Sequence, residues 1–92
     1  MDKINDFAQT VELMDSRDYK ERFIAEYCQL EIRIKRLERV LKSVADNTCP
    51  RCFTPTCPIT LLEDQFKAMT AYREILVKRA LIEELELPEV DV

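Results

Sequence analysis

The chain has 92 residues, which suits one small domain and is too short for two. Hydrophobic residues make up 47% of it and charged residues 35%, while glycine and histidine are both absent. Without glycine it has no glycine-rich phosphate-binding loop, and without histidine it has no serine–histidine pair or HExxH zinc site. These absences exclude most familiar enzyme classes, and the remaining composition is typical of long helices.

Targeting signals are also missing from the sequence. No apolar run approaches the roughly 20 residues that span a membrane, and the start MDKINDFAQ is too polar for a signal peptide. Without an export signal, the four cysteines are expected to be reduced thiols or metal ligands rather than disulfides. We therefore expect a cytoplasmic protein with no membrane partner.

The predicted elements begin with a short helix over residues 3–14, where apolar residues recur at helical spacing. A capping-box pattern at Asp18 then predicts a second helix over residues 18–45. Its apolar residues alternate steps of four and three for three heptads, which is the strongest periodic signal in the chain. Residues 46–57 are rich in cysteine and proline, so a turn is predicted there.

A third helix is predicted over residues 58–84, because Pro58 suits the first helical position, and residues 85–92 are expected to form a short acidic tail. The third helix carries more apolar surface than one neighbouring helix can cover. The fold prediction is a single all-α domain over residues 1–92. In it, a short N-terminal helix precedes a long antiparallel two-helix hairpin that assembles into a helical homo-oligomer.

The net charge of −4 hides an uneven charge distribution. Residues 1–18 carry a net charge of −3 and residues 83–92 one of −5, whereas residues 19–82 carry +4. Five basic residues lie between Arg33 and Lys42. This pattern predicts a basic surface that binds a small anion, or alternatively an ordinary solvated helix surface balanced by nearby glutamates. DNA is not an expected partner, because acidic segments flank the basic one.

The predicted turn contains Cys49, Cys52 and Cys57 at C-x2-C-x4-C spacing, and two cysteines at C-x2-C spacing are typical of half a structural zinc site. The fourth ligand is missing. A carboxylate such as Asp46, or thiolates of a second copy, would complete the site. The competing interpretation, which we favour, is free or loop-bridging thiols, so no cofactor is predicted and zinc is the alternative. Cys28 is expected to be a core residue.

Three sequence elements occur in a characteristic order: the DYKERF start at Asp18, the PTCPI-x-LL junction over 55–62, and a set of spaced residues in the last helix. That set comprises Met69, Tyr72, Leu76, Arg79 and Ala80. In this order they resemble a family of small helical-hairpin proteins of crAss-like phages and Bacteroides prophages, named after a crAss phage gene product. The leading helix and the Cys49–Cys52 pair depart from the family pattern, so the resemblance does not favour zinc.

A more remote similarity, at the level of the fold, is to the hairpin domain of phage anti-CBASS and Thoeris anti-defence sponges. It implies the sequestration of a cyclic-nucleotide signal. Such a ligand requires arginines near its phosphates and aromatic rings near its bases. The predicted phosphate ligands are Arg33, Arg36, Arg39 and Arg73, and the predicted stacking residue is Tyr19 or Tyr27. Tyr27 also fits the core seam, and Tyr19 fits a partly exposed first turn.

The predicted function is therefore that of a phage or prophage accessory protein that sequesters a small, cyclic nucleotide immune signal in pockets between protomers. No catalytic residue is predicted and no enzyme is expected, because nothing in the sequence pairs a nucleophile with a base. The alternative is a protein-binding helical oligomer, an inhibitor or adaptor of a host protein, with or without a structural zinc in the turn.

Overall fold

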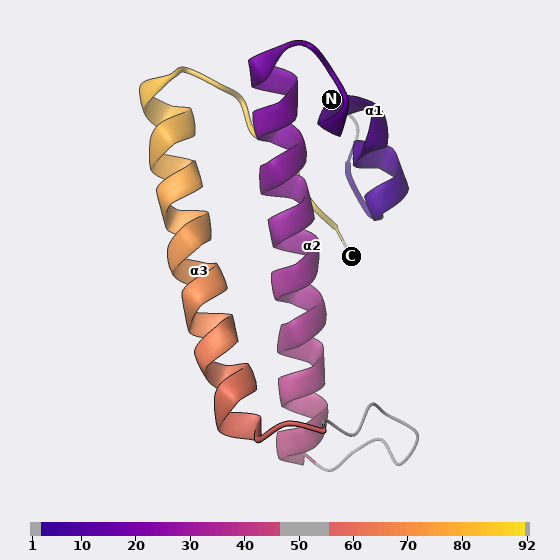
Figure 1. Ribbon diagram of the computed structural model, residues 1–92, viewed down its shortest axis with the longest axis vertical. Helices are drawn as coiled ribbons and strands as arrows, with labels where there is room; N and C mark the ends of the chain where they lie inside the picture. Colours follow the sequence, from indigo (N-terminus) through magenta and orange to yellow (C-terminus); the bar gives the residue numbers. More distant parts are fainter. Residues whose placement is uncertain (1–2, 47–55, 92) are drawn as a thin grey trace.

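The structure, a computed structural model, describes residues 3–46 and 56–91 (Figure 1). Its elements in chain order are the 3₁₀ turn η1 (Phe7–Thr10), α1 (Val11–Met14), α2 (Tyr19–Asp46) and α3 (Ile59–Ile82). The described residues form no strand, and their one β-type contact is an isolated bridge. The all-α prediction is confirmed.

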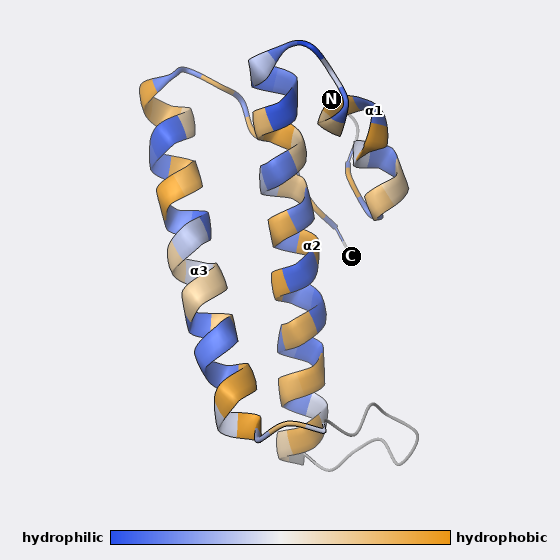
Figure 2. Ribbon diagram, viewed as in Figure 1, coloured by the Kyte–Doolittle hydropathy of each residue, from blue (hydrophilic) through white to orange (hydrophobic). Residues whose placement is uncertain are grey.

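The two long helices lie side by side and run in opposite directions (Figure 1). Apolar and polar residues are interleaved along both of them (Figure 2), and no described helix is long and apolar enough to cross a membrane. The seam between them buries one set of core residues: Phe23, Leu30, Ile34, Leu76 and Ala80. The apolar face of α2 thus packs against the apolar face of α3, as expected for two amphipathic helices.

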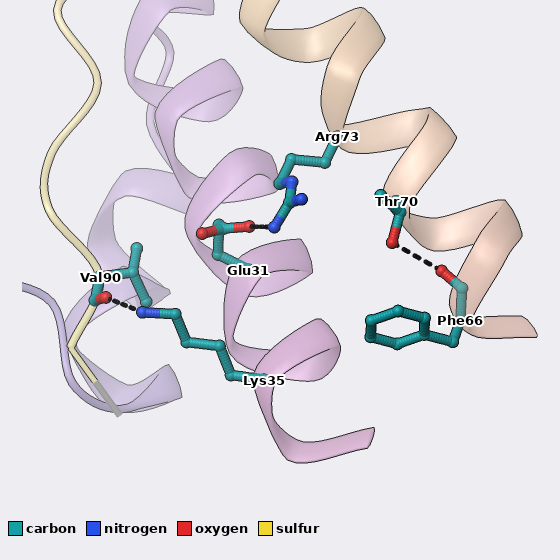
Figure 3. A network of polar contacts seen from close by, with 6 residues as sticks. All are labelled: Glu31, Lys35, Phe66, Thr70, Arg73 and Val90. Atoms are coloured by element: carbon teal, nitrogen blue, oxygen red, sulfur yellow. Dashed lines mark hydrogen bonds and ion pairs between the residues drawn. The ribbon is translucent and has the colours of Figure 1, made fainter. Parts of the chain in front are cut away.

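A second core lies on another face of α2. It consists of Ile4, Cys28, Ile32 and Val90, so both ends of the chain pack against this helix. The Ile4 amide donates to the Glu89 carbonyl at 2.9 Å, and the Asp91 amide donates to the Ile4 carbonyl at 2.8 Å. The Lys35 ammonium donates to the Val90 carbonyl (Figure 3). The helix α2 is therefore covered by α3 on one face and by the terminal segments on another.

The expected helix over 3–14 is corrected at its start, because helical structure begins only at Phe7. Ile4 is instead paired with Val90 and buried, which holds the residues before η1 in an extended conformation. Asp6 then caps η1, since its carboxylate accepts a hydrogen bond from the Gln9 amide at 3.1 Å. The first residues of the chain therefore extend the second core rather than the helix.

Residues 85–92, expected to form a short acidic tail, contribute apolar side chains to the two cores. Leu85 and Leu87 pack against the first core, and Val90 belongs to the second. The helix α3 ends at Ile82, two residues before its expected end, in a Schellman-type turn. In this turn the Leu85 amide donates to the Ala80 carbonyl at 2.8 Å, and Glu84 has a left-handed φ of 57°. The apolar residues among the acidic ones thus bring the segment back onto α2.

Candidate functional site

A cavity of about 510 Å³ lies where η1, α2 and α3 meet, and we call it the arginine pocket. Its volume falls within the range of small-molecule sites. The helix α2 supplies two leucines and two arginines, α3 supplies three residues and η1 supplies one. The lining residues are Phe7, Leu30, Arg33, Arg36, Leu37, Gln65, Met69 and Tyr72.

Two of the predicted phosphate ligands meet at the Phe7 ring. The guanidinium carbon of Arg36 lies 4.6 Å from the ring centroid, and that of Arg33 lies 5.7 Å from it. Stacking uses the face of a guanidinium and leaves its N–H edges free to donate. Neither arginine forms a salt bridge with a described residue, so both retain donors for an added anion.

The charge of the arginine pocket is uniformly positive. Its lining includes two guanidinium groups and no carboxylate. The lining also includes Tyr72, which is partly exposed, and leucine and methionine side chains complete the apolar part of the surface. A flat ligand with one anionic and one aromatic part matches this combination, because guanidinium groups bind phosphates and aromatic rings stack on bases.

A smaller cavity of about 330 Å³ adjoins the arginine pocket and shares Leu30, Arg33 and Tyr72 with it. Beyond the shared residues it is lined by Gln29, whose amide nitrogen donates to the Thr10 hydroxyl at 2.9 Å. Arg22 and Glu26 also line it, so its charge is mixed. Of these two neighbouring cavities, only the arginine pocket is lined without a carboxylate.

Another cavity, of about 520 Å³, lies between the C-terminal end of α2 and the N-terminal end of α3. Apolar residues of both helices dominate its lining, together with Glu63 and Lys67. These two opposite charges cancel, so this cavity attracts an anion less strongly than the arginine pocket does.

Two other predicted phosphate ligands lie outside the pocket. Arg39 is exposed on the next turn of α2 and does not line the cavity. Arg73 donates to the Glu31 carboxylate at 2.8 Å (Figure 3), and this hydrogen bond raises the pKa of Arg73. Because Glu31 is only 8% exposed, Arg73 is committed to neutralising a buried carboxylate. The pair joins α2 to α3.

Neither predicted stacking tyrosine lines the pocket. Tyr27 packs against both cores, and its pKa is raised by burial and then by the nearby Glu31 carboxylate. Tyr19 donates to Glu83 at 3.3 Å and accepts from Arg79. It begins α2, about 20 Å along the helix from Arg33. The aromatic residues of the pocket are instead Phe7 and Tyr72.

In the sequence, Phe7 falls within the apolar pattern of residues 3–14, and Tyr72 belongs to the spaced residues of the predicted last helix. Met69 belongs to the same spaced residues, and Gln65 was assigned no role. One sequence signal could have indicated that Tyr72 lines a pocket: its ring is apolar and its hydroxyl polar, which suits the edge of a helix–helix seam better than the centre. Nothing local links Phe7 to Arg36, because their contact depends on how the leading segment folds back.

The zinc prediction falls mainly outside the described residues, since Cys49 and Cys52 lie there. Cys57 is a half-buried free thiol. Among the residues that the structure describes, no three potential metal ligands lie close enough together to hold an ion. Cys28 is fully buried, which agrees with its expected core role. Burial, and secondarily the Glu31 carboxylate, raises the pKa of Cys28 to about 11.

A family model described as Sequestin matches residues 17–82, which is more than two thirds of the chain. The matched range includes α2, α3 and every lining residue of the arginine pocket except Phe7. The comparisons with curated proteins and with solved structures found no match.

Proposed function

The chain belongs to the Sequestin family, and from this premise we propose that it binds and sequesters a small, cyclic nucleotide immune signal without catalysis. The name of the family refers to sequestration, which favours capture over turnover. In this proposal it is a phage or prophage accessory protein that acts in the cytoplasm of the host cell as a homo-oligomer of helical hairpins. The observation that carries the proposal is the carboxylate-free arginine pocket with its two aromatic walls.

The phosphate end of the ligand belongs at Arg33 and Arg36. Both guanidinium groups lie over the Phe7 ring, a cation–π contact that favours this position before the ligand arrives. A preorganised guanidinium loses less side-chain entropy on binding than a freely moving one. Their N–H edges supply charge-assisted hydrogen bonds to phosphate oxygens.

The base end of the ligand belongs at Tyr72, which α3 contributes to the pocket lining. A ring that is partly exposed can stack a base, and each base stacked on an aromatic ring contributes about 1–3 kcal/mol. The adjoining cavity shares Tyr72 and offers the Gln29 side chain as a polar contact, which gives room for a second base. This length suits a ligand that contains more than one nucleotide unit.

Capture without turnover agrees with the chemistry of the lining residues. None of the eight has a carboxylate, thiol, hydroxymethyl or imidazole group that would pair a nucleophile with a base. Arginines and aromatic rings bind such a ligand and hold it. The bound nucleotide should therefore leave the protein chemically unchanged.

A thermal-shift screen of the full chain against cyclic di- and trinucleotides and ADP-ribose derivatives tests the proposal. A ligand at one hundred times its dissociation constant adds about 2.7 kcal/mol of stability. We expect at least one compound to stabilise the wild type and the Arg17→Ala control, and not the Arg33→Ala/Arg36→Ala double variant. A panel in which no compound stabilises the wild type contradicts nucleotide binding.

The same sample tests the absence of catalysis. After overnight incubation at equal concentrations, the protein is heat-denatured and the released nucleotide is analysed by chromatography. Sequestration predicts full recovery of the original compound, and a new product would contradict it.

The exposed apolar residues of α3 favour a second function, that of a protein-binding oligomer that inhibits or adapts a host protein. In this alternative the arginine pocket plays no part. Binding of a host protein that is unaffected by the Arg33→Ala/Arg36→Ala change would support it over the nucleotide proposal.

A further inference from the structure

One face of α3 carries apolar residues that neither α2 nor the terminal segments cover. Leu61, Ala68, Ile75 and Ile82 follow each other at intervals of seven, and we call them the outer stripe. Leu61 is 58% exposed, Ile75 56% and Ile82 81%, and Ala68 is exposed as well. Residues seven apart on a helix stay in one line along a partner helix when the two helices supercoil.

We propose that the outer stripe of α3 is the contact surface for α3 of a second copy, in antiparallel orientation about a two-fold axis near Ala71. This proposal gives the homo-oligomer of the proposed function a definite surface. It does not depend on nucleotide binding, so the two can fail separately.

The outer stripe is symmetric about the middle of the helix. Leu61 and Ile82 are equally distant from the point between Ala71 and Tyr72, and so are Ala68 and Ile75. In an antiparallel pair centred there, Leu61 of one copy lies near Ile82 of the other, and Ala68 lies near Ile75. A small residue then faces a large one, which lets the two helices approach closely.

Two charged residues favour the antiparallel orientation over the parallel one. Asp64 and Lys78 occupy the same heptad position, are both exposed, and are centred on Ala71. Neither forms a salt bridge with another described residue. Antiparallel pairing brings Asp64 of each copy to Lys78 of the other, whereas parallel pairing places like charges together. A surface that complements itself in this way is the mark of a two-fold interface.

The outer stripe also borders the arginine pocket. Tyr72 lies four residues after Ala68 and three before Ile75, so these three side chains are neighbours on the helix surface. A second copy seated on the stripe would therefore pack beside Tyr72, which lines the arginine pocket.

Sedimentation equilibrium of the full chain without nucleotide tests the contact. We expect the wild type at twice the mass of one chain, and Ile75→Glu to weaken association at least hundredfold, giving single chains with unchanged helicity. The matched control is Val77→Glu, two residues away and 44% exposed but off the stripe, which should keep the wild-type mass. If Ile75→Glu lowers helicity, Ala68→Glu replaces it. A single-chain wild type, or a stripe variant of unchanged mass, overturns the proposal.

Cysteine cross-linking tests the orientation. In a background where Cys49, Cys52 and Cys57 are serine, Asp64→Cys and Lys78→Cys variants are oxidised separately and as a mixture. Antiparallel pairing predicts disulfide-linked dimers in the mixture and few in either variant alone. Efficient cross-linking of each variant with itself would overturn the antiparallel register.

Discussion

At the scale of single residues, the turn that ends α3 places a glutamate in a backbone conformation that favours glycine. Glu84 occupies the left-handed position of a Schellman-type turn, which glycine usually fills because a side-chain Cβ is disfavoured there. The chain has no glycine anywhere, so the hydrogen bonds of the turn and the packing of Leu85 hold this conformation.

Glu84→Gly should therefore stabilise the protein by about 0.5–1 kcal/mol, since relief of the left-handed penalty exceeds the added freedom of the unfolded chain. The measurement is urea unfolding followed by circular dichroism. Glu84→Ala is the matched control, because it removes the same carboxylate and keeps the Cβ. Equal stabilities of the two variants would contradict this account of the turn.

Cys28 predicts a pH dependence. Its thiol is fully buried and its pKa is raised from 9.0 to about 11. Between these values the unfolded chain has released the proton and the folded chain still holds it, so the free energy of unfolding falls as pH rises from about 9 to 11. Below pH 9 this contribution is fully present.

The Cys28→Ala change removes the ionisable thiol and with it this pH-dependent contribution to the free energy of unfolding. Unfolding free energies measured under reducing conditions should show the stability advantage of the wild type over Cys28→Ala shrinking between about pH 9 and pH 11. Parallel pH profiles of the two proteins would contradict the burial of a neutral thiol.

At the scale of elements, Glu31 and Arg73 tie α2 to α3 across the seam. Arg73→Met leaves the Glu31 carboxylate buried without a partner. Because the arginine is itself partly exposed, we expect a loss of about 2–4 kcal/mol, somewhat below the full cost of breaking a buried pair. The double variant Glu31→Leu/Arg73→Met should recover most of it, since two apolar residues replace two charges.

The Arg73→Met variant also shows whether Arg73 has a structural or a ligand-binding role. Nucleotide affinity of the folded Arg73→Met protein should equal that of the wild type, because Arg73 does not line the arginine pocket. Calorimetric titration at a temperature where the variant is fully folded measures this. A tenfold weaker affinity would instead place Arg73 in the binding site.

The sequence predicted the long helices best because their signals are local. The structure gives Tyr19–Asp46 and Ile59–Ile82 where periodicity, a capping box and a proline indicated 18–45 and 58–84. The bridge of Ile4 to Val90 joins opposite ends of the chain, so no local pattern could have indicated it.

At the scale of the whole molecule, the site depends on how separate segments meet. Arg33, Arg36, Arg39 and Arg73 are equivalent as sequence, and only the fold separates the two that line the pocket from the two that do not. Arg73 forms an ion pair with Glu31, 42 residues away in the sequence. The aromatic lining residues are Phe7 of η1 and Tyr72 of α3 rather than the predicted tyrosines. The choice of pocket residues therefore required the tertiary structure.

The second core explains why α2 is the centre of the molecule. It is buried against α3 on one face and against both terminal segments on another, while α3 keeps an exposed apolar stripe. We propose that the arginine pocket takes a nucleotide and that the outer stripe of α3 takes a second copy.

Calorimetric titration of wild type, Arg36→Ala and Arg17→Ala with a nucleotide that stabilises the protein tests the central claim most directly. The Arg36 guanidinium, held over Phe7 at 4.6 Å, should form a charge-assisted bond worth about 1.5–3 kcal/mol, so Arg36→Ala should weaken binding about ten- to hundredfold. Arg17→Ala, which carries the same charge change on an exposed residue outside the pocket, should bind as the wild type does. Equal affinities of Arg36→Ala and wild type would contradict the assignment of the arginine pocket as the nucleotide site.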